Sequence, residues 1–405
     1  MVALFLASQL RADTISVPAD MPVSQEELQL EINIKLQRVQ QFLAQQGLAG
    51  VLITRVENVS WITGGLADNH IVITSEVGAA SLLIMRDGSR YMVGEEGELA
   101  RMSREDLRGL GYEVRSYKWY QDKTTPDRKL EIIHQLAHSQ PIGTDVSYAD
   151  LKQVADLVAP LRYQLTESEI KKYRWVGHVA SEAVIAVCRK IQPGMSERQI
   201  EALASQELMQ RGLRPTVLLM GVDHRVMDFY HHTPSDLRLR RYAIVNVCAR
   251  RWGLVVSVAR FVHFGALEPE LIRKQKAAMN ISALFEANSK PGVTAGQMME
   301  RAEKWYADAG FPGDWQEHHQ GGAIGYAERE WLAVPGSSEM IHDHQAFAWN
   351  PIIHGTLSFD TILVEGDHLE NLTRTTDWPT KPVEIDGVQY WMPEILIRSG
   401  EEGTR

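Results

Sequence analysis

The chain has 405 residues, more than one hydrophobic core usually holds, so two domains are expected. Hydrophobic residues make up 44% and charged residues 23%, a balance typical of folded proteins that excludes disordered, collagen-like and low-complexity chains. Lys and Arg number 42 against 52 Asp and Glu, a formal charge of −10 with no basic cluster, so no nucleic-acid partner is expected.

The cysteines and the apolar runs indicate a compartment. Cys188 and Cys248 are too few for a disulfide framework and have no CxxC spacing, which suits a reducing compartment. The apolar start lacks a basic segment and has Arg11 where a signal peptide needs its cleavage site. No run approaches the roughly 18 apolar residues of a membrane span. We therefore expect a cytoplasmic protein with no membrane partner.

The first part of the chain indicates an α/β domain over residues 24–163. Ser24 and Glu27 form a capping box before an apolar pattern of helical spacing that ends at Gly47. An apolar run at 50–54 predicts a strand. Further predicted elements are strands at 70–74 and 80–85 forming a hairpin, and alternating helices and strands at 95–110, 113–119, 128–138 and 142–145.

The second part, residues 164–400, contains an internal repeat. Gly194 and Gly292 each follow a proline in a turn that opens a helix, and each helix ends at a glycine 18 residues on, Gly212 and Gly310. The two copies are offset by 98 residues, and β-rich sequence follows each. This pattern predicts two diverged halves related by a pseudo-twofold, with a cleft between their sheets.

Several motifs follow one another in this second part. They are a long helix, a Pro-Gly turn, His231-His-Thr-Pro-Ser-Asp236, a β-rich 243–265, His318-His-Gln-Gly-Gly-Ala-Ile-Gly325, Ala348-Trp-Asn-Pro351 and Ser358-Phe-Asp-Thr-Ile362. Their order resembles the pita-bread superfamily of methionine aminopeptidases, Xaa-Pro peptidases and creatinase, and the preceding domain resembles the creatinase/prolidase N-terminal domain. The resemblance covers about residues 24–375. It implies an α/β N-terminal domain followed by an α+β pita-bread domain with an internal pseudo-twofold.

Metallopeptidases of this superfamily hold two metal ions with two Asp, one His and two Glu. The resemblance places these five ligand positions at Asn246, Ser257, Gly322, Asn350 and Phe359. None of the five side chains supplies a carboxylate or an imidazole, whereas two divalent cations need several anionic ligands. We therefore expect neither a dinuclear metal centre nor another cofactor.

Histidines offer a different chemistry. Creatinase is a metal-free member of the superfamily that hydrolyses a C–N bond with a histidine as proton shuttle, and the resemblance places that histidine at His231 or His232. A neutral imidazole near its ordinary pKa can both accept and donate a proton at pH 7. Neighbouring side chains on a strand point to opposite faces, so each doublet, including His318-His319, should offer one inward histidine at most. That expectation argues against a metal site rebuilt from imidazoles. The two glutamates of creatinase fall at Ala259 and Asn350, so creatine itself is not expected as the substrate.

The segment 326–330 supplies the remaining charge near the expected cleft. A guanidinium at Arg329 can bind a carboxylate or phosphate bidentately, and Glu330 can act as a base or pair with a neighbour. By analogy with the superfamily, Trp61, Asp68 and Asn69 line a substrate site at a subunit boundary, which implies a homodimer.

Two functions remain open. The favoured one is a metal-independent, creatinase-like hydrolase or lyase acting on a C–N or related bond of a small anionic or zwitterionic substrate. Its expected catalytic residues are His231, His232, His319 and Glu330, and its expected substrate-binding residues are Arg329, Asn350, Asn246, His318, Tyr326, Trp61, Asp68 and Asn69. The alternative is an inactive pseudo-peptidase that binds a ligand or peptide, which the apolar Phe359 favours. A metal-dependent Xaa-Pro dipeptidase is a weaker third interpretation.

Overall fold

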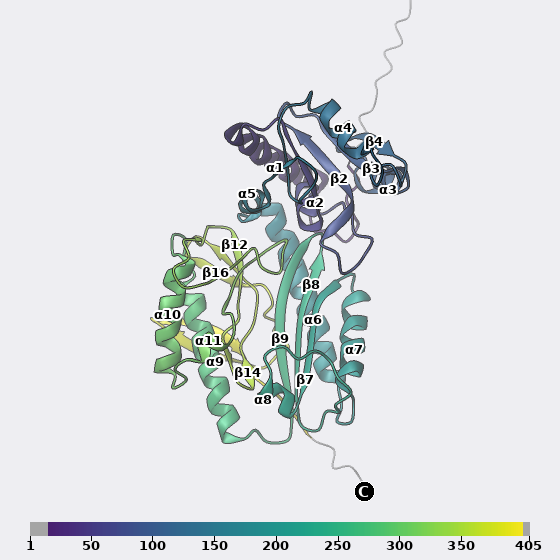
Figure 1. The fold of residues 1–405 in the computed structure, drawn as a ribbon. Coiled ribbons are helices and arrows are strands. Elements are labelled where there is room, and N and C mark those ends of the chain that lie inside the picture. The colour runs from purple at the N-terminus through teal and green to yellow at the C-terminus, as the bar shows by residue number, and fades with distance from the viewer. Residues whose placement is uncertain (1–14, 400–405) are drawn as a thin grey trace, which may run out of the picture. The chain divides into compact units, whose positions relative to one another are not determined.

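The computed structural model describes residues 15–399, which form two compact units, one ending at Leu161 and the other starting at Arg162 (Figure 1). The first unit contains the helices α1 (Gln25–Gln46), α2 (Val56–Ile62), α3 (Glu96–Arg101), α4 (Arg128–Leu136) and α5 (Ala155–Val158). Its strands are β1 (Gly50–Arg55), β2 (Val77–Met85), β3 (Arg90–Glu95), β4 (Glu113–Tyr117), β5 (Ile142–Thr144) and β6 (Lys152–Gln153).

The first unit is a mixed six-stranded sheet in the order β4-β3-β2-β1-β5-β6. Strand β1 pairs antiparallel with β2 and parallel with β5. The predicted capping box is confirmed, because Glu27 N donates to Ser24 Oγ and Ser24 N donates to Glu27 Oε2. Helix α1 ends at Gly47, whose φ of 66° is the left-handed conformation that glycine adopts without strain.

The predicted strand at 70–74 is wrong. These residues form bends and turns, and the strand that pairs with β1 begins at Val77. The cause lies in Asn69, whose Nδ2 donates to Thr54 O at 2.9 Å and to Ala80 O at 2.8 Å. Because the Asn69 amide bonds the backbone of both strands, the chain that follows leaves the sheet, and Ile73 is 74% exposed.

The second unit contains two similar halves. Its helices are α6 (Glu167–Lys190), α7 (Glu197–Met209), α8 (His224–Asp228), α9 (Pro269–Asn288), α10 (Ala295–Asp308) and α11 (Asp314–Glu317). Its strands are β7 (Arg214–Val222), β8 (Tyr242–Arg251), β9 (Leu254–Phe264), β10 (Gly321–Ile324), β11 (Trp331–Leu332), β12 (Gln345–Trp349), β13 (Ile352–Ile353), β14 (Thr356–Leu357), β15 (Ile362–Glu365), β16 (His368–Asn371), β17 (Thr380–Ile385), β18 (Val388–Pro393) and β19 (Leu396–Arg398).

Two sheets form the middle of this unit, in the orders β19-β9-β8-β7 and β11-β10-β12-β15-β16. Helices α6 and α7 pack on the first sheet, and α9 packs on β12 and on the small hairpins (Figure 1). The internal repeat is confirmed, and the helices that open its two copies begin with the same type of N-cap. Ser196 and Thr294 each form a capping box at the start of α7 and α10, and each makes an isolated β-bridge, to Arg238 and to Met340.

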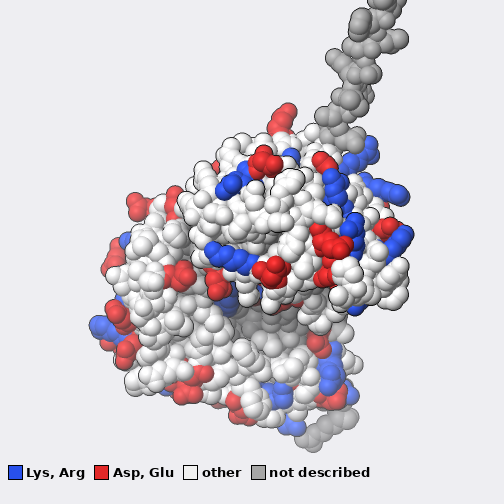
Figure 2. Space-filling model, turned by 45° about the horizontal axis from the view of Figure 1, so that its top comes forward, with Lys and Arg blue, Asp and Glu red and all other residues white. Residues whose placement is uncertain are grey.

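A buried ion pair joins β9 to the segment that precedes β15. Nη2 of Arg260 on β9 lies 2.8 Å from Oδ1 of Asp360, and Thr373 Oγ1 donates to the same carboxylate oxygen. On the face shown in Figure 2, basic and acidic side chains are interspersed. No helix among residues 15–399 is long and apolar enough to cross a membrane.

Candidate functional site

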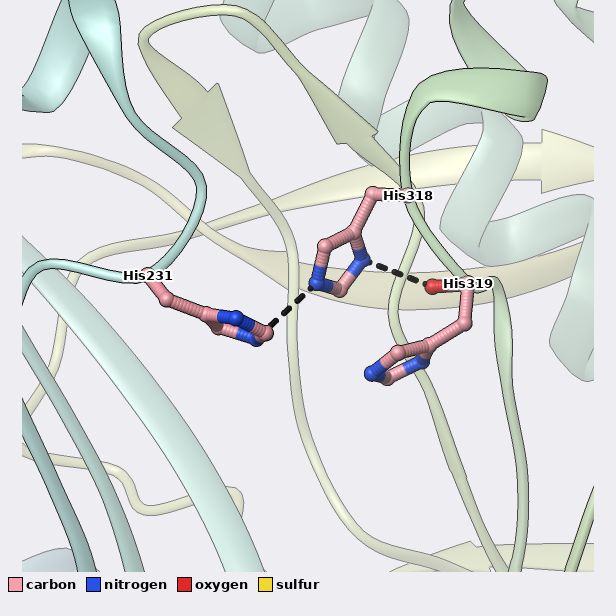
Figure 3. A group of neighbouring side chains, drawn as sticks. All are labelled: His231, His318 and His319. Atoms are coloured by element: carbon pink, nitrogen blue, oxygen red, sulfur yellow. Dashed lines mark hydrogen bonds between the residues drawn. The ribbon is translucent and has the colours of Figure 1, made fainter.

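Three imidazoles meet in the second unit (Figure 3). His231 lies in the loop after α8, and His318 and His319 lie in the segment between α11 and β10. Nε2 of His231 is 3.1 Å from Nε2 of His318, and one nitrogen from each of the three rings lies within 4.8 Å of the others. We call these three residues the histidine cluster.

Both residues of the 318–319 doublet belong to the cluster, so the expectation of one inward histidine per doublet is wrong here. The two residues lie outside any strand, and their ring centroids are only 4.1 Å apart. Strand alternation therefore does not apply to them. In the other doublet, which also lies outside any strand, His232 is 2% exposed and packs against Gly221.

Hydrogen bonds to the backbone define which nitrogen carries the proton on two of the rings. His318 Nδ1 lies 2.8 Å from the carbonyl oxygen of His319, and a carbonyl can only accept, so Nδ1 of His318 is protonated. Gly321 N–H can only donate, and it lies 3.2 Å from Nδ1 of His319, so a neutral His319 carries its proton on Nε2. His318 Nε2 is then an acceptor, and His231 donates to it from Nε2 and keeps a lone pair on Nδ1.

Partial burial favours the neutral form of His318 and His319. It lowers the pKa of His318 to about 4 and the pKa of His319 to about 3, and the positive charge of Arg329 lowers both further. The pKa of His232 is also lowered, mainly by burial. At neutral pH His318 and His319 therefore each offer one donor and one acceptor nitrogen.

Arg329 is a cation without a carboxylate partner among the described residues. Its Nη1 donates to the carbonyl of Glu328 at 2.5 Å, while its Nε is buried and has no hydrogen-bond partner. Burial lowers its pKa, and the guanidinium carbon lies 5.9 Å from the Phe359 ring. A buried guanidinium with free donors is an unsatisfied site for an anion.

Two amides complete the polar groups that the sequence placed here. Asn350 Nδ2 lies 3.4 Å from His318 Nδ1; because that nitrogen carries a proton, the amide has to face it with Oδ1, the buried atom that otherwise has no partner. Asn246 on β8 also has a buried Oδ1 without a partner in the described structure. Buried acceptors of this kind are costly unless a ligand or water satisfies them.

Tyr230 contacts the cluster and His354 contacts Tyr230, and neither was identified from the sequence. Tyr230 Oη lies 2.5 Å from Nε2 of His354, and the Tyr230 ring packs against His318 at 5.5 Å between centroids. Burial and the acidic residues Glu317 and Asp314 raise the pKa of Tyr230 to about 12. Only the HisHis doublet next to Tyr230 signalled this loop, because His354 comes from a separate turn 124 residues away.

Two further candidates serve the local structure. Glu330 forms a buried ion pair with Arg162, 2.7 Å between Oε2 and Nη2, and it accepts from Tyr326 N at 2.9 Å. Tyr326 is 1% exposed and donates to Glu169 Oε1 at 2.7 Å. Both side chains hold the turn that presents Arg329, and we assign neither a chemical role.

The three candidates of the first unit lie apart from the cluster in the chain, and the structure gives each of them local surroundings. Trp61 is fully buried beside Lys35, and Asn69 holds β1 and β2 together. Asp68 binds locally, with its Oδ1 accepting from His70 N.

The histidine cluster is the one group of three or more His, Cys, Asp or Glu side chains in residues 15–399 arranged to hold a metal ion. It contains no carboxylate. In the tautomers assigned above, only His318 presents a lone pair to the centre of the cluster. Coordination by His231 and His319 therefore requires the ring proton of each to move from Nε2 to Nδ1.

The fold and this site define a two-domain protein of the creatinase and Xaa-Pro peptidase type with a pita-bread second domain. Residues 171–376 match Metallopeptidase family M24, and residues 35–176 match the Creatinase/Prolidase N-terminal domain. The chain belongs to the M24 family.

Known relatives extend over nearly the whole chain. A Xaa-Pro dipeptidase from Pyrococcus horikoshii is 24% identical over 370 residues, covering 85% of this chain and 98% of that protein. Among solved structures, the dipeptidase PepE of Mycobacterium ulcerans superposes with a TM-score of 0.71 at 19% identity, covering 91% of this chain and 98% of that one. The prolidase of P. horikoshii superposes with a TM-score of 0.69 at 20% identity, covering 84% and 98%. These likenesses show the fold.

Proposed function

We propose that this protein hydrolyses a C–N bond in a small substrate that carries a carboxylate, and that it does so without the two-metal centre of the family. The observation that carries the proposal is the Arg329 guanidinium, which has a buried donor without a partner, together with a carboxylate-free histidine cluster in which its charge acts on His318 and His319. The relatives named Xaa-Pro dipeptidases support the reaction type, since a dipeptide has an amide bond and a terminal carboxylate.

The residues at the expected ligand positions do not fit two metal ions. Ser257 Oγ lies 3.0 Å from Cys248 Sγ, and Phe359 is a buried aromatic ring. Gly322 has no side chain, and Asn246 and Asn350 carry uncharged amides. With no carboxylate to offset dehydration, the family's metal pair has no support at these positions.

Arg329 anchors the substrate in this proposal. A guanidinium matches the two oxygens of a carboxylate and makes charge-assisted bonds roughly twice as strong as neutral ones. Binding would also satisfy the Nε donor that is orphaned in the described structure. The carboxylate therefore gains affinity from a cation that the fold already keeps desolvated.

The imidazoles move the protons. Nδ1 of His231 accepts a proton from the attacking water as the new C–O bond forms, and it returns this proton to the nitrogen as the C–N bond breaks. Nε2–H of His319 donates to the carbonyl oxygen on which negative charge develops. His318 holds His231 in the required tautomer through the 3.1 Å bond, so it acts as a positioning residue.

A substrate panel tests the proposal with untagged full-length protein. The panel contains Xaa-Pro and other dipeptides, N-acetyl and N-carbamoyl amino acids, and the C-terminal amide of each, with amine release followed by mass spectrometry. We expect release from carboxylate-bearing members, little from their amides, and a KM raised about 10- to 100-fold in Arg329→Gln. Absence of release from the whole panel, with or without binding, would overturn the hydrolase proposal.

A further inference from the structure

The histidine cluster has a second property that proton transfer does not require. Two nitrogen ligands of a tetrahedral zinc ion, each at about 2.0–2.1 Å from the metal, lie roughly 3.3 Å apart. The Nε2 atoms of His231 and His318 are already 3.1 Å apart without an ion between them. The third imidazole has to move inward by at most roughly 1.5 Å, since all three nitrogens lie within 4.8 Å of one another.

The surroundings of His318 match those of a metal-binding histidine. Its Nδ1–H is held by the carbonyl oxygen of His319 at 2.8 Å, so its Nε2 lone pair points to the centre of the cluster. Metal-ligating histidines typically donate their other ring N–H to a carbonyl or carboxylate in this way. His231 is exposed, so an ion can reach the cluster from solvent.

We propose that His231, His318 and His319 bind a single transition-metal ion of the zinc and cobalt class. Three imidazoles suit borderline-soft ions and give the three-ligand set with an open fourth position, whereas magnesium and calcium require oxygen ligands. This site is distinct from the family's carboxylate-rich pair of metals, and it goes beyond the proposed reaction.

Occupancy of this site blocks the proposed hydrolysis. Coordination at Nε2 of His231 shifts its proton to Nδ1, the atom that has to accept a proton from water. Coordination at Nε2 of His319 removes the N–H that faces the reacting carbonyl. The ring proton moves to Nδ1, which can then no longer accept the hydrogen bond from Gly321 N–H. The ion is therefore an inhibitor, and a chelator raises turnover instead of abolishing it.

Arg329 couples the metal to the anion. Its positive charge acts on both His318 and His319, so it opposes a cation in the cluster until a carboxylate neutralises it. An anion at Arg329 should therefore tighten metal binding by about tenfold, the usual size of such a coupling.

Cobalt(II) titration of untagged, chelator-stripped, full-length protein tests the site without reference to any substrate. We expect a visible ligand-field absorption that saturates at one ion per chain in wild type. His318→Ala and His319→Ala should lose it, whereas His178→Ala, which changes an exposed histidine on α6, should keep it. Circular dichroism melting of each variant establishes that it is folded. Absence of the absorption in wild type, or an equal absorption in folded His318→Ala, would overturn the site.

Acetate serves as the anion probe in the same titration. We expect 10 mM acetate to tighten cobalt binding in wild type and to leave Arg329→Gln unchanged. Equal effects on both proteins would refute the coupling. Since these titrations do not measure turnover, they decide the metal site even if the substrate panel fails.

Discussion

Nε2 of His231 lies 3.1 Å from Nε2 of His318, although the two residues stand 87 positions apart in the chain. His231 comes from the first half of the second unit and His318 from the second half, so the contact forms only when the two halves of the repeat are folded together. The carbonyl of His319 orients the His318 ring. In this orientation Nε2 of His231 is the donor of the pair and Nε2 of His318 is the acceptor.

The tautomers can be observed directly. We expect nitrogen-15 NMR of metal-free protein at pH 7 to show His318 protonated at Nδ1 and His319 protonated at Nε2, because one faces a carbonyl and the other a backbone N–H. His318→Ala and His319→Ala assign the signals. Opposite tautomers would remove the base that we assign to His231.

The Arg329 side chain that binds the anion in our proposal should lower the stability of the folded protein. We expect Arg329→Met to raise the unfolding free energy by about 1 kcal/mol, because an apolar side chain replaces a buried cation that has no carboxylate partner in the described chain. Acetate should raise the melting temperature of wild type and not that of the variant, as scanning fluorimetry will show. A less stable Arg329→Met that still responds to acetate would place the anion elsewhere.

The Arg162–Glu330 pair should stabilise the second unit. Both side chains are nearly inaccessible, 6% and 2% exposed, so Arg162→Ala leaves a buried carboxylate without its main partner. We expect a loss of about 3–5 kcal/mol in urea denaturation. The matched control is Arg174→Ala, which removes a side chain that is 43% exposed and pairs with Glu365 and Glu370, and it should cost less than about 1 kcal/mol. Equal losses in the two variants would show that burial of the pair is irrelevant.

Glu286 should make stability depend on pH. Burial, with a contribution from the charge of Asp360, raises its pKa well above the ordinary value, so the folded protein binds this proton more tightly than the unfolded chain. Its stabilising contribution is complete below the ordinary glutamate pKa and is lost as pH rises through the folded-state pKa. Relative to Glu286→Gln, wild type should therefore become less stable from pH 4 to pH 9 in urea denaturation. Glu303→Gln, an exposed change on α10, should run parallel to wild type.

The sequence predicted the parts of the fold that depend on local signals. The capping box at Ser24 and the repeated turns before Ser196 and Thr294 predict the starts of three helices through short-range hydrogen bonding. All three helices begin at these residues in the structure. The prediction of a strand at 70–74 was wrong because an alternating apolar pattern cannot show that the Asn69 side chain donates hydrogen bonds to backbone carbonyls of β1 and β2.

The site was harder to predict because its geometry depends on tertiary contacts. The motifs named His231, His318, His319 and Arg329 as candidates, but strand alternation applied to the 318–319 doublet gave the wrong orientation, since the segment is not a strand. Tyr230 contacts His318 and His354 contacts Tyr230, and no spacing in the chain relates Tyr230 to His354. Glu330 had a charge that suited a base, and only the fold shows that Arg162 holds it.

The most direct test is turnover before and after metal removal, using the best substrate of the panel and untagged protein whose metal content is measured by mass spectrometry. We expect the stripped protein to keep or increase its turnover, zinc to inhibit it, and Arg329→Gln to lose it at low substrate concentration. If stripping abolishes turnover and two metal ions per chain restore it, the protein uses the family's dinuclear chemistry and hydrolysis by the imidazoles alone is contradicted.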